Sequence, residues 1–123
     1  MESILNSIKK LLGPTEDYTH FDPDIVLHIN SAFANLHQLG VGPEEGFTIQ
    51  DESATWSEYL EDKKTLEFVK AYIYLKVRLV FDPPTIGSVM ESVKEAIKEY
   101  EWRITVAVDE LKKKESEAAT GNS

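Results

Sequence analysis

The sequence predicts a mainly α-helical protein, a small bundle of four to five helices with an extended acidic loop or short hairpin between the second and third main helices. Apolar residues recur at helical spacing over residues 65–81 and again over residues 86–111. The segment Phe81-Asp82-Pro83-Pro84 separates the two stretches. Because each proline lacks an amide donor and clashes with the preceding turn, a helix cannot continue through this pair. We therefore expect a sharp corner between two long helices.

Two shorter helices are expected before this corner. Residues 4–12 carry isoleucine and leucine on one side of a helix. A second helix begins at Asp22-Pro23-Asp24, where Asp22 caps free amides and the proline fits the first helical position. Gly40 then supplies the left-handed residue that closes this second helix.

Residues 41–64 break the helical pattern and form the predicted loop or hairpin. Trp56, Tyr59 and Leu60 fit a single helical turn, with Thr55 or Ser57 near its start. Loops of this length are uncommon in compact domains, and those that occur usually have a function. We therefore expect it to take part in contacts.

The stretch before the corner is the expected centre of the core. Twelve of the 17 residues from 65 to 81 are apolar, so this helix must be covered on most sides. Residues 72–81 also have the composition of a strand, but the spacing favours a helix. A narrow polar stripe runs along it: Lys63, Glu67, Lys70, Tyr74 and Arg78.

The last helix carries an apolar stripe over residues 86–111, about 39 Å long at 1.5 Å per residue. The other helices are too short to cover that length. Either its end projects toward another subunit or the helix frays after Val108, and we favour projection. Residues 1–114 are predicted to form a single helical domain, and residues 115–123, which are polar and small, a disordered tail.

The net charge of the chain is negative, and the charged residues are unevenly distributed along the sequence. Thirteen basic and 22 acidic residues give a net charge of −9, which repels phosphates and argues against nonspecific binding to nucleic acid or to an anionic membrane. Residues 41–62 contain seven acids and no base, whereas residues 63–82 contain five bases and two acids. These segments can meet within one chain or across a subunit boundary, or they can form ordinary solvated surface.

No catalytic pattern is present in the sequence. Its three histidines, His20, His28 and His37, lack the i, i+4 pairing with which a helix grips a metal ion. There is no cysteine, no GxSxG elbow and no phosphate-cradling glycine loop. No apolar run reaches transmembrane length. We therefore expect a protein that is not an enzyme, holds no cofactor or metal and has no membrane partner.

Four stretches carry a family resemblance: DIVLHINSAF (residues 24–33), LHQLGVGP (residues 36–43), Thr55-Trp56 and VKAYIYLKVRLVFDPP (residues 69–84). Together they resemble the head-tail connector proteins, also called head-completion or adaptor proteins, of tailed bacteriophages and prophages. The resemblance extends from about Ile4 to Trp102. The end of the chain, after Val108, resembles nothing in that family.

This resemblance implies a helical subunit that assembles, usually as twelve copies, into a ring under the portal protein in the virion neck. Such a ring extends the DNA channel, and double-stranded DNA passes through it without specific binding. The ring also contacts the next neck or tail-completion protein. The implied location is the virion neck, with the host cytoplasm as the place of assembly.

The acidic loop offers a contact with the basic helix of an adjacent copy, and such heterologous contacts generate rings when the rotation between copies closes. The subunit-interface candidates are Phe47, Ile49, Trp56, Tyr59, Lys63, Lys70, Tyr74 and Arg78. Glu95 and Glu99 on the last helix are the channel-wall candidates. The alternative is a small helical adaptor or regulatory protein that dimerises through the stripe over residues 86–111.

Overall fold

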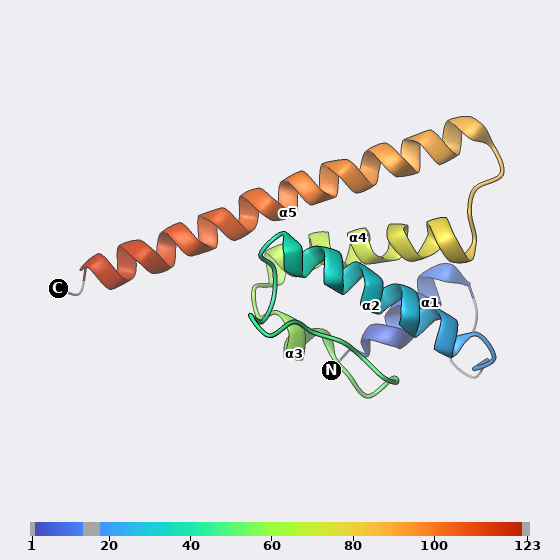
Figure 1. Ribbon diagram of the computed structural model, residues 1–123, viewed down its shortest axis with the longest axis horizontal. Helices are drawn as coiled ribbons and strands as arrows, with labels where there is room; N and C mark the ends of the chain where they lie inside the picture. The colour runs from blue at the N-terminus through green and yellow to red at the C-terminus, as the bar shows by residue number, and fades with distance from the viewer. Residues whose placement is uncertain (1, 14–17, 122–123) are drawn as a thin grey trace.

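The computed structural model describes residues 2–13 and 18–121. Within them the chain forms five helices and no strand: α1 (Ile4–Leu12), α2 (Asp22–Gln38), α3 (Trp56–Tyr59), α4 (Lys63–Phe81) and α5 (Gly87–Gly121). The predicted all-helical class is confirmed. Helices α1, α2 and α4 form the body, and α5 runs back across α4 and beyond it (Figure 1).

Helix α4 is the centre of the packing, because it contacts α1, α2 and α5. Val69, Tyr72 and Ile73 are fully buried there. Its first turn is capped by Asp62, whose carboxylate accepts a hydrogen bond from the backbone N–H of Thr65 at 2.9 Å. The segment over residues 72–81 is helical throughout, as the spacing predicted.

The start of α2 differs from the prediction. Phe21 occupies the cap position, and Asp22 is the first residue of the helix. The carboxylate of Asp22 lies 2.9 Å from the ammonium of Lys9 on α1, and Lys9 is fully buried. A buried ammonium is costly unless a carboxylate pairs with it, which explains why Asp22 turns toward α1. The end of α2 is as predicted, with Gly40 at φ 86° after the last turn.

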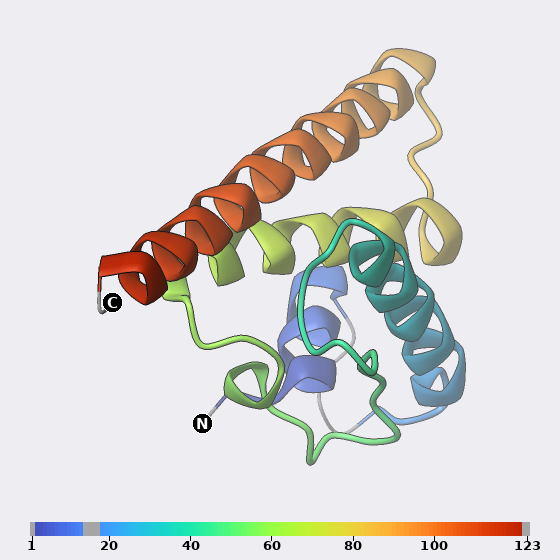
Figure 2. The ribbon, with the colours of Figure 1, turned by 60° about the vertical axis from the view of Figure 1, so that its left-hand side comes forward.

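The segment between α2 and α4 is the predicted loop and not a hairpin, and it folds onto the body (Figure 2). The side-chain amide of Asn30 on α2 holds Ile49, accepting from its N–H at 2.8 Å and donating to its carbonyl at 2.9 Å. Thr55 forms an isolated antiparallel bridge with Ser3. The predicted helical turn is confirmed as α3, and the N–H of Thr55 donates to Glu58 at 3.2 Å at its start.

The double proline lies between the end of α4 at Phe81 and the start of α5 at Gly87, so the predicted corner is confirmed. Val93, Ile97, Ile104 and Val108 are buried on the α4 side of α5. The end of α5 projects from the body as a helix up to Gly121 (Figure 1).

The projecting end corrects the disordered tail that was predicted for residues 115–123. Residues 115–121 are helical, whereas residues 122–123 lie outside the described part. Lysine, glutamate and alanine dominate residues 112–119, and these are strong helix formers. They also extend a helix that is already packed, so they do not bear the cost of nucleation.

Candidate interaction surfaces

The apolar residues predicted to anchor a neighbouring subunit lie in the protein's own core. Ile49, Trp56 and Tyr59 are only 2–4% exposed. Phe47 is half-buried, and its ring lies 5.1 Å from that of Tyr59. The indole N–H of Trp56 donates to Ser7 of α1 at 2.8 Å. Ile49, Trp56 and Tyr59 therefore have almost no surface to present to a second copy, contrary to the prediction, whereas Phe47 keeps part of its surface exposed.

Lys70, a basic interface candidate, also finds its partners within the subunit. Its ammonium lies 2.9 Å from Glu2 and 3.6 Å from Glu67, and 5.7 Å from the centre of the Trp56 ring. Neither carboxylate belongs to the acidic loop, contrary to the contact that was predicted. The remaining candidates of α4 keep solvent contact: Lys63 is exposed, and Tyr74 and Arg78 are half-buried.

The channel-wall candidates, Glu95 and Glu99, lie exposed on α5. At about 100° per residue they point away from Ile104, which is buried against the body. Glu99 accepts a hydrogen bond from Arg103 at 2.8 Å, a pair between exposed side chains that contributes little to stability. The side of α5 that carries Glu95 and Glu99 is called the outer face below.

The outer face also carries two apolar side chains that the sequence reasoning missed. Trp102 is 65% exposed, and Val106, one turn later, is 37% exposed. Tryptophan is among the residues that most often dominate protein–protein contacts. The signal was available, since Trp102 falls on the opposite side of the helix from the apolar stripe. Trp102 is therefore a candidate for a contact with another protein.

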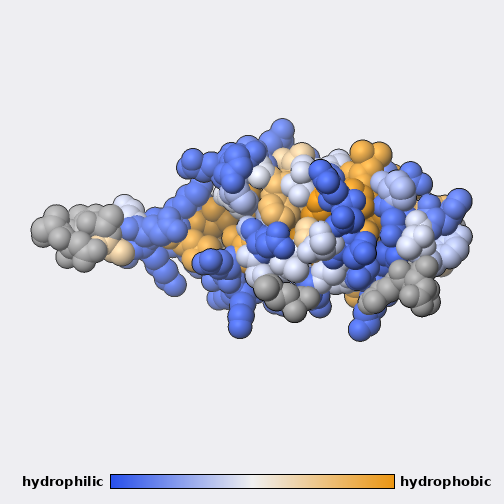
Figure 3. Space-filling model, turned by 90° about the horizontal axis from the view of Figure 1, so that it is seen from below, coloured by the Kyte–Doolittle hydropathy of each residue, from blue (hydrophilic) through white to orange (hydrophobic). Residues whose placement is uncertain are grey.

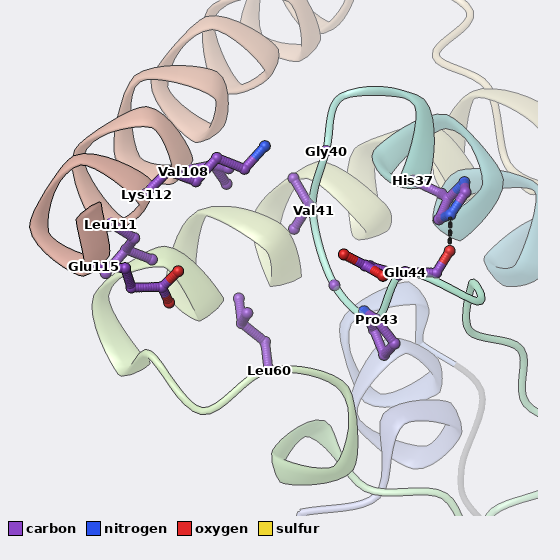
Figure 4. Close-up of a pocket in the computed structure, with 11 residues that line it drawn as sticks. His37, Gly40, Val41, Pro43, Glu44, Leu60, Val108, Leu111, Lys112 and Glu115 are labelled. Atoms are coloured by element: carbon purple, nitrogen blue, oxygen red, sulfur yellow. Dashed lines mark hydrogen bonds between the residues drawn. The ribbon is translucent and has the colours of Figure 1, made fainter. Parts of the chain in front are cut away.

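A cleft of about 440 Å³ opens on the other side of α5, where this helix leaves the body (Figure 4). Val41 and Leu60 line it from the body, and Leu111 lines it from α5. Its charged residues are Glu44, Lys112 and Glu115. Seen from below, apolar residues are visible beside the projecting end of α5 (Figure 3). This cleft, called the α5 cleft below, combines an apolar wall with a charged rim.

The turn that forms one wall of the α5 cleft is fixed by short-range contacts. Nε2 of His37 donates to the carbonyl of Glu44 at 2.8 Å. Gly40 and Gly42 have φ values of 86° and 85°, which only glycine adopts without strain. His37 therefore has a structural role in this turn.

The alternative dimer surface, the stripe over residues 86–111, is largely occupied. Ile104 is fully buried, and Val93, Ile97 and Val108 are each 7% exposed. The start of the stripe stays open, where Ile86 is 62% and Val89 is 39% exposed, and Leu111 at its end borders the α5 cleft. A dimer through this stripe would have to displace α4, which corrects that alternative.

Within the described ranges, no group of three or more histidine, aspartate or glutamate side chains is placed to hold a metal ion. No helix in this part of the chain has the length and apolar character needed to cross a bilayer.

Within the described residues, five helices around one core, with charged and apolar surfaces left open on a long terminal helix, define a small all-helical protein. A family model described as phage connector protein matches residues 4–111, which include α1 to α4 and α5 as far as Leu111. The chain belongs to the phage connector protein family. Searches of curated proteins and of solved structures found no match.

The family membership confirms the resemblance to head-tail connector proteins and gives the chain the structural role of a phage connector. The projecting end of α5, after Leu111, lies outside the match.

Proposed function

We propose that the chain assembles into a ring of twelve copies under the portal protein, where it extends the DNA channel and joins the head to the tail. Its place is the virion neck, and it assembles in the host cytoplasm. Its partners are further copies of itself, the portal protein and the next neck or tail-completion protein. It is a structural protein and not an enzyme, and it works without a cofactor.

The observation that carries this proposal is the outer face of α5 in a chain of the connector family. Helix α5 packs on α4 along one side, which leaves Glu95, Glu99, Trp102 and Val106 in contact with solvent. A 35-residue helix whose second side is open supports a role in assembly, because that side has no partner within the described chain.

The negative net charge of the chain supports the proposal that DNA passes through the ring. A net charge of −9 gives the duplex few cations to bind, so phosphates can slide past without displacing counterions. We propose that Glu95 and Glu99 line the channel. The outer face then divides along its length: its first part faces DNA, and the part at Trp102 and Val106 contacts protein.

The test is a phage whose gene for this chain carries an early stop codon. We expect heads that package DNA but lose it and that carry no tails in electron micrographs. Supplying the chain from a plasmid restores tailed particles. Infectious tailed particles that lack the chain would refute the proposal.

A further inference from the structure

We propose that the outer face of α5 from one copy docks into the α5 cleft of the next copy, with the indole of Trp102 entering the cleft. This inference rests on the proposed ring and identifies the two surfaces that build it. Both surfaces belong to the same subunit, so each copy offers one and receives the other.

The docking element is small and well defined. Trp102 is 65% exposed, the largest exposed fraction among the large apolar side chains of the described chain. Val106 follows one turn later on the same face and extends the apolar contact along the helix. Arg103 and Glu99 flank Trp102 as an exposed ion pair. An apolar centre with a charged border is the usual anatomy of a protein–protein contact.

The α5 cleft has a matching size and lining. Its volume of about 440 Å³ lies in the range of pockets that enclose small ligands, about 300–1,000 Å³. Val41, Leu60 and Leu111 give it an apolar wall. In the close-up, Leu111 comes from α5 and Leu60 from the chain below it (Figure 4). Burying an indole against such a wall removes a large apolar area from water.

The polar groups of the two surfaces are complementary. A buried indole N–H requires an acceptor, and the carboxylates of Glu44 and Glu115 border the cleft. The guanidinium of Arg103, next to Trp102, meets the same carboxylates. Arg103, the cation next to Trp102 in the sequence, therefore has opposite charges across the contact.

Trp102 can enter an α5 cleft only if that cleft belongs to a second copy of the chain. Trp102 lies about 160° around the helix from the buried Ile104 at 100° per residue. Leu111 lies close to the direction of Ile104, so the cleft opens on the opposite side of α5. One subunit cannot fill its own cleft with its own Trp102. A contact between two different surfaces is heterologous, so it continues from copy to copy and forms a ring when the rotation between copies closes, whereas pairing of α5 with a second α5 would stop at a dimer.

Cysteine cross-linking tests this arrangement directly, since the chain has no cysteine. The substitutions Val106→Cys and Glu44→Cys are combined in one chain. Purified virions that contain this chain are then treated with an oxidant or a short bis-maleimide. We expect a ladder of cross-linked species that rises past the dimer. Val106→Cys alone should remain monomeric on the gel. A dimer from this single variant would overturn the inference, because it would show that α5 pairs with α5.

Substitution of the indole gives a second measurement. Trp102→Ala and Trp102→Glu should leave the thermal midpoint unchanged, because the side chain is largely exposed. Both should reduce tailed particles in the plasmid rescue at least tenfold, and glutamate more than alanine. Leu27→Ala is the matched control, since Leu27 is 64% exposed on α2 and should rescue at the wild-type level.

The outcomes separate the inference from the proposed function. If wild-type necks contain a ring but Trp102→Glu rescues fully and the double-cysteine chain does not form a ladder, only the choice of surfaces is wrong. If wild-type virions hold no ring of this chain, the proposed function fails, and the inference fails with it.

Discussion

Tyr72 of α4 donates a hydrogen bond from its hydroxyl group to the carboxylate of Glu101 on α5, at 3.0 Å. The tyrosine is fully buried, so this bond lies within the packed contact between the two longest helices. Together with the buried apolar side chains of α5, it determines the rotation of this helix about its own axis. That rotation decides which side chains form the outer face.

Tyr72→Phe should lower the free energy of unfolding by about 1–2 kcal/mol, because it removes a hydrogen bond to a charged acceptor but leaves the ring in place. Glu101 stays half-buried and can be hydrated, which limits the loss. Urea denaturation measures the change. Tyr18→Phe, at a half-exposed tyrosine, is the control and should be neutral. An equal effect of both variants would show that the bond does not stabilise the α4–α5 contact.

Stability should fall as the pH rises above about 10, the ordinary pKa of tyrosine. Burial raises the pKa of Tyr59, and burial followed by the nearby Glu101 raises the pKa of Tyr72. The folded protein keeps these protons at a pH where the unfolded chain has lost them, so the unfolded state binds fewer protons and stability declines. The Tyr59→Phe, Tyr72→Phe double variant should show a shallower decline in urea titrations at pH 9 to 11. An unchanged slope would contradict this assignment.

The buried ion pair between α1 and α2 should respond unequally to loss of each partner. Asp22→Ala leaves the buried Lys9 ammonium without this carboxylate, and we expect a loss of about 3 kcal/mol. Lys9→Met should cost less, since methionine fills the space of the lysine stem and Asp22 is partly accessible to water. Lys94→Met, at an exposed pair, should change stability by less than about 1 kcal/mol. An Asp22→Ala effect as small as that control would contradict the role of the pair.

Gly42→Ala should be strongly destabilising, by about 2–4 kcal/mol, for two reasons. Its φ of 85° disfavours any side chain, and a Cβ atom there would lie 2.6 Å from the ring of Tyr59. Gly13→Ala separates the two effects, because Gly13 has a φ of 115° but no atom within 4 Å of the added Cβ. For Gly13→Ala we expect only the loss of stability that comes from backbone strain. Equal melting temperatures for the two variants would show that the contact with Tyr59 is unimportant.

Reversing two charges on the outer face should slow DNA ejection, if the proposed channel is correct. The double variant Glu95→Arg, Glu99→Arg places cations where the duplex would slide, and phosphate contacts made there weaken as salt rises. Ejection timed by a DNA-binding dye should therefore be slower, and most so at low salt. Glu45→Arg, Glu52→Arg makes the same charge change on the exposed loop and should eject normally. Equal rates of DNA ejection from the two double variants would show that α5 does not line the channel.

The local signals in the sequence were sufficient for the helices, except for the end of α5 after residue 114. Apolar spacing, the double proline and Gly40 act within a few residues, and each has its expected place in the structure. The position of the loop depended on distant partners that spacing does not reveal. Asn30 and Ile49 are 19 residues apart, and Trp56 and Ser7 are 49 residues apart. For this reason apolar loop residues that looked available for contact are buried in the core.

The candidate surfaces were predictable to different degrees. The exposure of Glu95 and Glu99 follows from the helical period, and the same period would have revealed Trp102. The α5 cleft could not be predicted, because it forms where the turn after α2, Leu60 and α5 meet. Lys9 and Asp22 show the same limit, since the sequence suggested a cap and the packing produced an ion pair.

Native mass spectrometry of the chain with its portal protein, over a range of concentrations, tests the central claim most directly. The proposed connector role predicts a complex of one portal with twelve copies of this chain, whether or not the chain is oligomeric alone. A chain that remains a monomer or dimer and never joins the portal at any concentration would contradict it.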